Sequence, residues 1–290
     1  MKGREGPGGI TRRHRRLSDA ETRERMLRTA IEMIDRDGLT VSLEHISFEA
    51  VIRAADVSRS TAYRHWQYKH QFYGDLVREL ASSAGPPIVR DEISLIKQVL
   101  AEHEDRLATT NGRHRVMIEL IRRLAAFDLD AILASPAWRT YHALCATVSG
   151  LTDSDLRDQV QAALAESENA RIARIADAWR TLTGLFGYRL RPDLDTEFET
   201  LASVLSVAMH GLVVAAIAAP DVARREIVAS PFDDGPPQRW SLSALSVAGT
   251  ALTFLEPDPH APNDEQHVAQ VYRAIDEWAS RLAGEASSRD

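Results

Sequence analysis

The sequence predicts an all-α fold, and three observations support this prediction. Apolar residues recur at intervals of three and four along nearly the whole chain, as they do on the buried face of a helix. Turns that contain glycine or proline separate these stretches. No stretch alternates apolar and polar residues as a half-buried strand does, so no sheet is expected.

A helical N-terminal region is expected over residues 18–84. Residues 1–17 are rich in Gly, Arg and Lys and carry few apolar side chains, which predicts a disordered arm. Ser18 and Glu21 have the spacing of a capping box that starts a first helix, and Gly38 follows its last turn. The buried stripe of this helix consists of Met26, Leu27, Ala30, Ile31, Met33 and Ile34.

Three more helices complete the N-terminal region. The pattern predicts a second helix over about 44–54, a tight break over 55–58 and a third helix that begins at Ser58. A fourth helix is predicted over 69–83, and Gly85-Pro86-Pro87 ends the region.

Residues 88–290 are predicted to form a larger helical domain. A loop over 230–238 is too rich in proline for any helix, and a last amphipathic helix is expected from Asn263 to about Leu282. The other turns are expected at Asn111-Gly112, Ser135-Pro136, Gly150 to Ser154, Gly187 to Asp193 and Pro220-Asp221.

One segment of this domain has the length and composition of a membrane span. Residues 201–219 carry no formal charge, but Ser203, Ser206, His210 and Gly211 interrupt the segment and acidic residues lead into it. We expect a buried helix of the protein interior, because such a helix is apolar on every side, and no membrane association.

The charge is distributed unevenly along the chain. Residues 1–70 carry 14 Lys and Arg against 10 Asp and Glu, whereas residues 71–290 carry 21 against 32. A basic end and an acidic remainder orient a protein on a phosphate surface, although chance scatter is an alternative. Cys145 is the single cysteine, which excludes an internal disulfide and favours a cytoplasmic location. No apolar core follows the first arginines, so no secretory signal is expected.

The second and third predicted helices have the pattern of a helix-turn-helix, whose second helix fits the DNA major groove. Val57, Ala62 and Trp66 occupy the inward stripe of the third helix. The outward side chains are of types that hydrogen-bond bases and phosphates, and they are Arg59, Ser60, Tyr63 and Arg64.

Residues 18–76 resemble the N-terminal domain of the TetR family of bacterial transcriptional regulators. The matching features are a first helix that ends at Gly38, the Val57-Ser58 turn, the run Thr61-Ala-Tyr63-Arg-His65-Trp66, and Lys69 at the start of the next helix.

The sequence departs from the family pattern at three places. Asp56 replaces the turn glycine, although aspartate tolerates the left-handed conformation. Ile52 replaces a small alanine, and the span 38–51 is longer than usual. These departures affect the angle between the second and third helices.

The resemblance implies a helix-turn-helix domain, a helical ligand-binding and dimerisation domain, and a homodimer that binds a palindromic double-stranded DNA operator. The implied function is a ligand-responsive repressor. The expected DNA-binding residues are Arg12, Arg13, Arg15, Arg16, Ser58, Arg59, Ser60, Thr61, Tyr63, Arg64, His65 and Lys69. For the four arm arginines the alternatives are a minor-groove contact and a solubilising tail, and for Tyr63 and Trp66 the alternative is core packing.

A small apolar or aromatic effector is expected to bind the larger domain. Large aromatic side chains with a few polar atoms are typical of ligand pockets, although core packing is the default for each residue. The candidates are Trp138, Tyr141, His142, Cys145, Trp179, Phe186 and His210.

No catalytic motif, cofactor-binding motif or metal site is found, so an enzyme is not expected. The alternatives to a regulator are a helical protein–protein adaptor and a ligand-binding protein without operator function.

Overall fold

In the computed structural model, residues 18–37, 47–83, 89–148, 154–232, 235–261 and 265–287 are described. They divide into two compact units. The first unit contains the described residues up to Leu80 and Ala143–Val160, and the second contains those of Ala81–His142 and those from Gln161 onward. The chain boundary at Leu80 lies near the predicted one, whereas the inclusion of residues 143–160 in the first unit has no counterpart in the sequence pattern.

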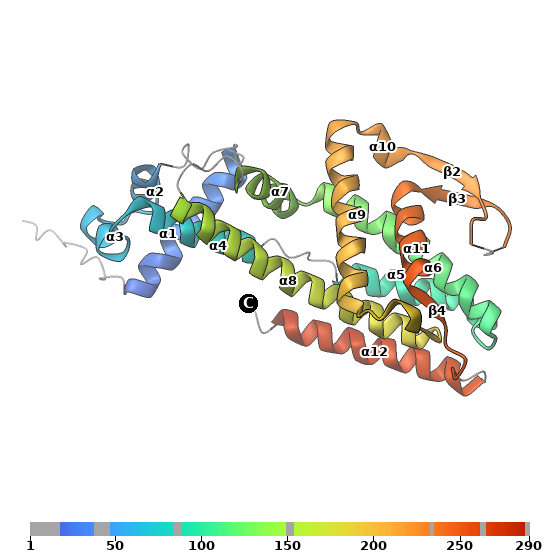
Figure 1. The fold of residues 1–290 in the computed structure, drawn as a ribbon. Helices are drawn as coiled ribbons and strands as arrows, with labels where there is room; N and C mark the ends of the chain where they lie inside the picture. The colour runs from blue at the N-terminus through green and yellow to red at the C-terminus, as the bar shows by residue number, and fades with distance from the viewer. Residues whose placement is uncertain are drawn as a thin grey trace, which may run out of the picture. The chain divides into compact units, whose positions relative to one another are not determined.

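The helices of the first unit begin and end where local signals place them (Figure 1). Ser18 and Glu21 form the predicted capping box, since each backbone N–H donates to the other residue's side chain at 2.7 and 3.1 Å. Ser47 and Ser58 cap the next two helices, so the second helix begins at Phe48 and not at about residue 44 as predicted. The helices are α1 (Asp19–Asp37), α2 (Phe48–Ala54), α3 (Arg59–His65) and α4 (Lys69–Ser83). Gly38, Gly85, Pro86 and Pro87 lie outside the described residues.

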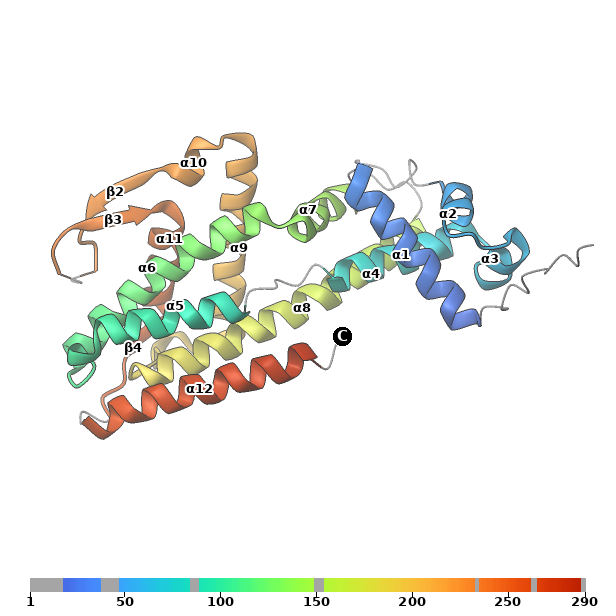
Figure 2. The same cartoon turned by 180° about the vertical axis from the view of Figure 1, so that it is seen from behind.

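The second unit is a helical bundle whose central helix is α6. This helix packs against α5, α9 and α11, and α12 packs against α5 (Figure 2). The helices that contribute to the second unit are α5 (Val89–Glu102), α6 (Thr110–Ala134), α7 (Pro136–Val148), α8 (Ser154–Leu185), α9 (Phe198–Ala218), α10 (Asp221–Arg224), α11 (Leu242–Phe254) and α12 (Glu265–Ser287), with two short 3₁₀ turns at Glu104–Arg106 and Pro192–Leu194.

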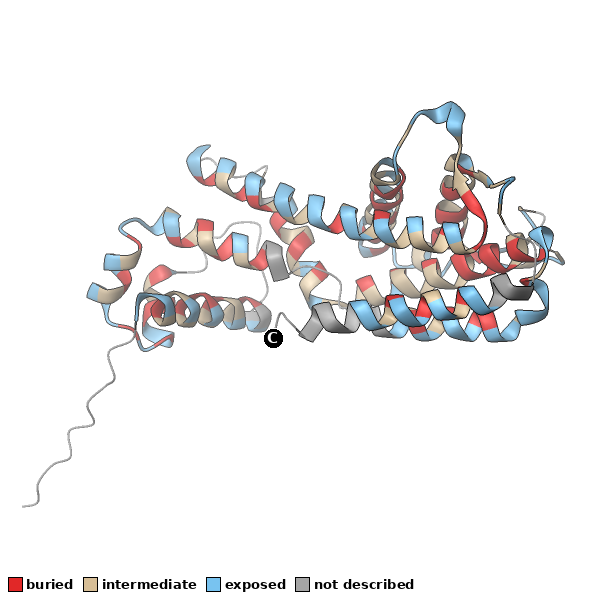
Figure 3. Cartoon of the chain, turned by 90° about the horizontal axis from the view of Figure 1, so that it is seen from below, coloured by how far each residue is buried: buried red, intermediate tan, exposed pale blue. Residues whose placement is uncertain are grey.

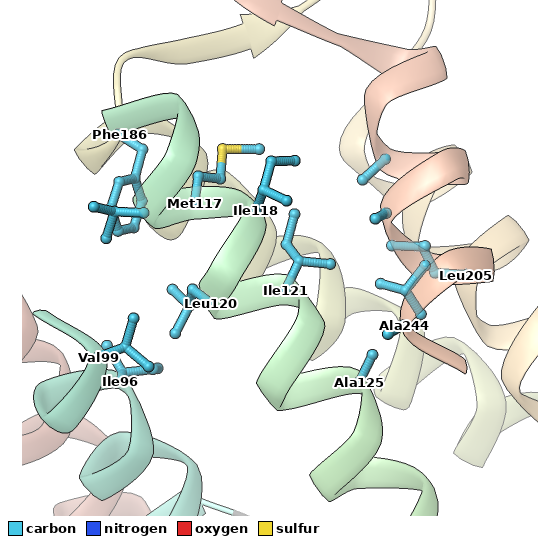
Figure 4. Packing of buried hydrophobic residues seen from close by; sticks show 14 of the residues in the cluster. Ile96, Val99, Met117, Ile118, Leu120, Ile121, Ala125, Phe186, Leu205 and Ala244 are labelled. Carbon is cyan, nitrogen blue, oxygen red and sulfur yellow. The ribbon is translucent and has the colours of Figure 1, made fainter. Parts of the chain in front are cut away.

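The core of this unit fills both sides of α6. Leu120 lies toward Ile96 of α5, whereas Ile121 lies on the side of Leu205 and Ala244, from α9 and α11 (Figure 4). Buried residues recur along the helices and give way to exposed residues on their outer faces (Figure 3). The alternation follows the helical period on which the sequence prediction rests.

The described residues are mostly helical, as the sequence predicts, but they also include four short strands that its pattern did not predict. β1 (Tyr188–Leu190) pairs antiparallel with β4 (Leu255–Pro257), and β2 (Glu226–Ala229) pairs antiparallel with β3 (Gln238–Ser241). Each strand has only three or four residues, so its side chains cannot show a two-residue period that stands out from the helical pattern.

The predicted turn at Asn111-Gly112 is also wrong, because both residues lie in the first turn of α6. Thr109 caps this helix and accepts a hydrogen bond from the Gly112 N–H at 3.1 Å. A Cβ atom at position 112 would lie 1.9 Å from the carbonyl oxygen of Arg106. The glycine therefore permits close backbone approach at the start of a helix and does not mark a turn.

Gly112→Ala is expected to destabilise the second unit by about 1–3 kcal/mol, because the added methyl group must displace backbone atoms. Thermal unfolding of the full chain measures the change. Gly184→Ala is the matched control, since its Cβ would meet nothing within 4 Å. Equal melting temperatures for the two variants would contradict the close approach.

α9 is the helix that the sequence places in the interior, and only one of its faces is buried. Leu201 and Leu205 are buried, whereas Val207, Val214 and Ile217 are 71%, 57% and 62% exposed. Among the described residues, α9 is the one helix long and apolar enough to cross a membrane. The expectation of a helix buried on every side is therefore wrong, because the uncharged sequence also supplies an exposed apolar face.

Candidate nucleic-acid interface and ligand cavity

The third helix of the first unit is held by a small apolar core. Ala62 is fully buried and Trp66 is 2% exposed, as the inward stripe predicts. Phe48 packs edge-on against Trp66, with ring centroids 6.1 Å apart, and also contacts Phe72. Phe48 was not among the core residues predicted from the sequence, and it lies at the start of α2.

The turn between α2 and α3 contains a residue in the left-handed backbone conformation, which glycine adopts most easily. Asp56 has a φ of 52°, in the left-handed region. The predicted tolerance of aspartate at this position is confirmed. Ser58 then caps α3 by accepting a hydrogen bond from the Thr61 N–H at 3.1 Å, and it bonds the hydroxyls of Ser60 and Thr61.

Several predicted DNA-binding side chains are exposed on the outer face of this motif. Arg59 and Arg64 have side chains that are 72% and 51% exposed, and Tyr63 is 37% exposed. Ser60 and Lys69 are also exposed. His65 is half-buried and packs against the Trp66 ring at 4.4 Å. Arg12, Arg13, Arg15 and Arg16 lie outside the described residues.

A carboxylate that the sequence analysis missed lies among these side chains. Glu49 of α2 accepts hydrogen bonds from Arg59 Nε at 2.9 Å and from the Tyr63 hydroxyl at 2.8 Å. The bond from Tyr63 lowers the pKa of Glu49 and raises the pKa of Tyr63. Arg64 pairs with Asp19 of α1 at 2.9 Å. Both arginines are thus held at the surface by carboxylates from other helices.

A second carboxylate anchors the core side of α3. Asp75 of α4 accepts hydrogen bonds from Trp66 Nε1 at 3.1 Å, from Arg23 at 3.3 Å and from Arg78 at 2.6 Å. Burial raises the pKa of Asp75, but the bonds from Trp66 and Arg78 outweigh this effect, so the pKa lies below its ordinary value. Asp75 therefore stays ionised and fixes the end of the motif.

The second unit contains a cavity of about 220 Å³. Trp138, Trp179 and Phe186 of the predicted ligand set line it. The rest of the wall is mostly aliphatic and includes Ile96, Leu120, Ile121, Leu205 and Trp278. An engineered cavity of about 150 Å³ accommodates benzene, so a molecule with one or two rings fits this space.

Other members of the predicted set gather beside Trp138. Tyr141, His142 and His210 have ring centroids 5.5, 5.5 and 5.1 Å from the Trp138 ring. Burial lowers the pKa of His210 to about 4 and also lowers the pKa of His142, so both rings are neutral at pH 7. Cys145 is exposed and belongs to the first unit.

An arginine network closes this side of the cavity. Arg171 is buried, and its guanidinium lies 5.6 Å from the centroid of the Trp138 ring. It donates two hydrogen bonds to Glu168 and one to the Ser206 hydroxyl. Tyr141 donates to the same carboxylate at 3.1 Å. The charge of Arg171 is therefore neutralised within the protein.

Two further carboxyl groups lie in the cavity wall, Glu92 from α5 and Asp128 from α6. Burial and the neighbouring Asp128 raise the pKa of Glu92 to about 9, and burial raises the pKa of Asp128 to about 6. In the sequence, each member of this pair is a charged residue four positions before a buried isoleucine, Ile96 on α5 and Ile132 on α6. Neither carboxyl group was predicted to belong to the ligand site.

The acidic pair makes stability depend on pH. Between the ordinary carboxyl pKa and about 9, the folded protein retains a proton that the unfolded chain has lost, so stability falls as pH rises through this range. We expect Glu92→Gln to stabilise the protein at pH 8 by about 1–2 kcal/mol, or roughly 3–6 °C, and the gain to shrink toward pH 5.

Thermal unfolding from pH 5 to pH 9 measures this effect. Asp91→Asn is the control, because Asp91 is an exposed carboxylate in the same turn of α5. A gain for Glu92→Gln that is the same at every pH would contradict the shared proton.

No group of three or more His, Cys, Asp or Glu side chains that could hold a metal ion occurs within the part of the chain that the structure describes. Glu92 and Asp128 thus form a pair without a third ligand.

Comparison with known proteins gives a likeness of fold and no match of sequence family. No protein-family model and no curated protein matches the chain. The fold is similar to a solved structure of a proposed TetR-family transcriptional regulator from Mesorhizobium loti, with a TM-score of 0.43 and 15% identity. The match covers 82% of this chain and 99% of that one.

Proposed function

We propose that the chain is a DNA-binding transcriptional regulator of the TetR type, in which α3 enters the major groove of an operator. The observation that carries the proposal is the helix-turn-helix itself. Its inner face is buried through Ala62 and Trp66, and its outer face presents Arg59, Tyr63 and Arg64 to solvent. A polar helix held by a buried inner face is the form in which such motifs bind DNA.

Base contacts and phosphate contacts are expected from different residues. Arg59 and Arg64 lie on the outer face of α3, which suits base contacts, whereas Lys69 at the start of α4 and Tyr63 suit phosphate contacts. Arg59→Ala is expected to cost about 1–3 kcal/mol on the cognate site and to relax preference at one base pair in each half-site. Lys69→Ala is expected to weaken all sequences alike and to lower the salt dependence by about one phosphate per subunit.

The experiment begins by selecting protected fragments from a random library with the purified full-length protein. Binding curves at several salt concentrations then compare the two variants on selected and scrambled sites. Arg28→Ala is the control, because Arg28 is an exposed arginine of α1 that pairs with Glu24. If Lys69→Ala changes the sequence preference and Arg59→Ala changes only the salt dependence, the assignment of base and phosphate contacts is reversed. If the protein selects no fragment, the proposal that it binds an operator is refuted.

The protein is further proposed to act as a homodimer, since a palindromic operator requires two motifs. The exposed face of α9 supports this. Val204, Val207, Gly211 and Val214 recur at intervals of three and four on that face, and all four are exposed. A monomeric protein rarely exposes so large an apolar face. Ala202, Ser206 and Ala216 of the same helix are buried within the protomer and do not belong to this face.

A small molecule bound in the cavity of the second unit is proposed to weaken operator binding, as the ligand of a ligand-responsive repressor does. Coupling between two such sites is typically about 1–3 kcal/mol. The cavity supports the proposal through its size and through Trp138, Trp179 and Phe186 in its wall.

The domain assignment that accompanies the proposed function is an arm over 1–17, a DNA-binding domain over 18–84 and a regulatory domain over 88–290. The protein is proposed to be cytoplasmic.

A further inference from the structure

The cavity of the second unit has a negative end. Glu92 and Asp128 come from adjacent helices and share a hydrogen bond. The Oδ1 atom of Asp128 is buried and has no hydrogen-bond partner. No cation among the described residues forms an ion pair with either carboxyl group. Burying two carboxyl groups without a cation costs free energy. Only one of the two can readily ionise, because a second negative charge would be repelled by the first.

The rest of the charged wall does not compensate the pair. Of the lining residues that the structure describes, Arg171 is the other charged side chain. Its guanidinium is bound to Glu168 and Ser206, so it is not available to Glu92 and Asp128. A bound anion would find Arg171 already neutralised, whereas a bound cation would find an acceptor without a partner.

The wall of the same cavity also offers aromatic faces. Trp179, Phe186 and Trp278 all line the cavity. Indole and phenyl faces attract both aromatic rings and cations, and the attraction to a cation is stronger where water is excluded.

We propose that the cavity binds a small aromatic amine, with its ammonium group beside Glu92 and Asp128 and its ring against the tryptophans. The ammonium group takes the place of the proton that the acidic pair otherwise holds, and that proton passes to solvent. The role of this amine as effector rests on the proposed function, whereas its binding does not.

Calorimetry on the full-length protein without DNA tests the binding. The probes are 2-phenylethylamine, the neutral 2-phenylethanol and the anionic 3-phenylpropanoate. The amine is expected to bind at least about tenfold more tightly than the alcohol, because a buried charge pair forms only with the amine. The carboxylate is expected to show no binding.

The double variant Glu92→Gln with Asp128→Asn provides the second arm. It is expected to lose the preference for the amine while retaining 2-phenylethanol, which shows that the cavity is still folded. Asp130→Asn is the matched control, since Asp130 is an exposed acid of α6. Equal binding of amine and alcohol, tightest binding of the carboxylate, retention of the amine preference in the double variant, or binding of none of the three probes would each overturn the proposal.

Failure of the proposed function is recognised separately. Selection of operator fragments uses no amine. If the protein binds the amine but selects no DNA, the proposed amine site is supported and the proposed regulator function is refuted. If the protein binds both the amine and operator DNA, and the amine does not change operator affinity, the amine site is supported and only its role as an effector site is refuted.

Discussion

Replacing Val207 and Val214 together with aspartate is expected to convert the proposed dimer to a monomer. Both side chains lie on the exposed face of α9, at 71% and 57% exposure, so the protomer loses little packing. In a dimer formed through this face, four carboxylates would be buried without partners, which excludes association. Light scattering measures the mass, and operator affinity is expected to fall by at least about 100-fold because the two half-sites are no longer bound as one.

A matched variant tests whether the loss of association depends on the position of the new carboxylates on α9 or only on their charge. Val228→Asp introduces the same carboxylate at an apolar residue of β2 that is 70% exposed, and it is expected to remain dimeric. Gly211→Arg is an independent test, since the space around this glycine is open in the protomer and an arginine would block only a partner. If both α9 variants remain dimeric, α11 with residues 241–254 becomes the candidate interface.

Trp66→Ala is expected to destabilise the first unit by about 3–5 kcal/mol and to abolish operator binding. The indole is 2% exposed, contacts Phe48 and Phe72, and donates to Asp75 at 3.1 Å. Its removal leaves a cavity behind α3 and a half-buried carboxylate with one donor fewer. Urea unfolding followed by circular dichroism measures the loss.

Trp66→Phe separates the two contributions. It retains most of the ring packing and removes only the hydrogen bond to Asp75, for which we expect a loss of about 1 kcal/mol. An alanine variant that is no less stable than the phenylalanine variant would show that the indole does not hold the motif.

The starts of α1 and α3 were predictable from the sequence because their signals are local. Ser18 and Ser58 each accept a backbone N–H within three residues, so these caps depend on neighbours in the chain. Ser47 makes the same local bond but was not predicted as a cap. The inward stripe of α3 was predictable because its signal is local too. The helical period assigns Ala62 and Trp66 to one face, and both are buried.

The contacts that complete both sites were not predictable, because they join distant residues. Glu49 is 14 residues from Tyr63, and Glu92 is far along the chain from Asp128. A charged side chain on a helix is most often solvated, so its sequence gives no reason to pair it with another. The exposed face of α9 was missed because an uncharged helix has the same composition whether one face or all of it is buried.

The arrangement of the tryptophans gives the protein an intrinsic optical sensor. Of its five tryptophans, Trp138, Trp179 and Trp278 line the cavity, whereas Trp240 is buried in the second unit without lining it and Trp66 lies in the first unit. A molecule that enters the cavity contacts three indoles at once and leaves the other two without contact. The emission spectrum of the unlabelled protein is therefore expected to change in intensity and wavelength with cavity occupancy, and the signal of Trp66 supplies a constant reference within the same chain.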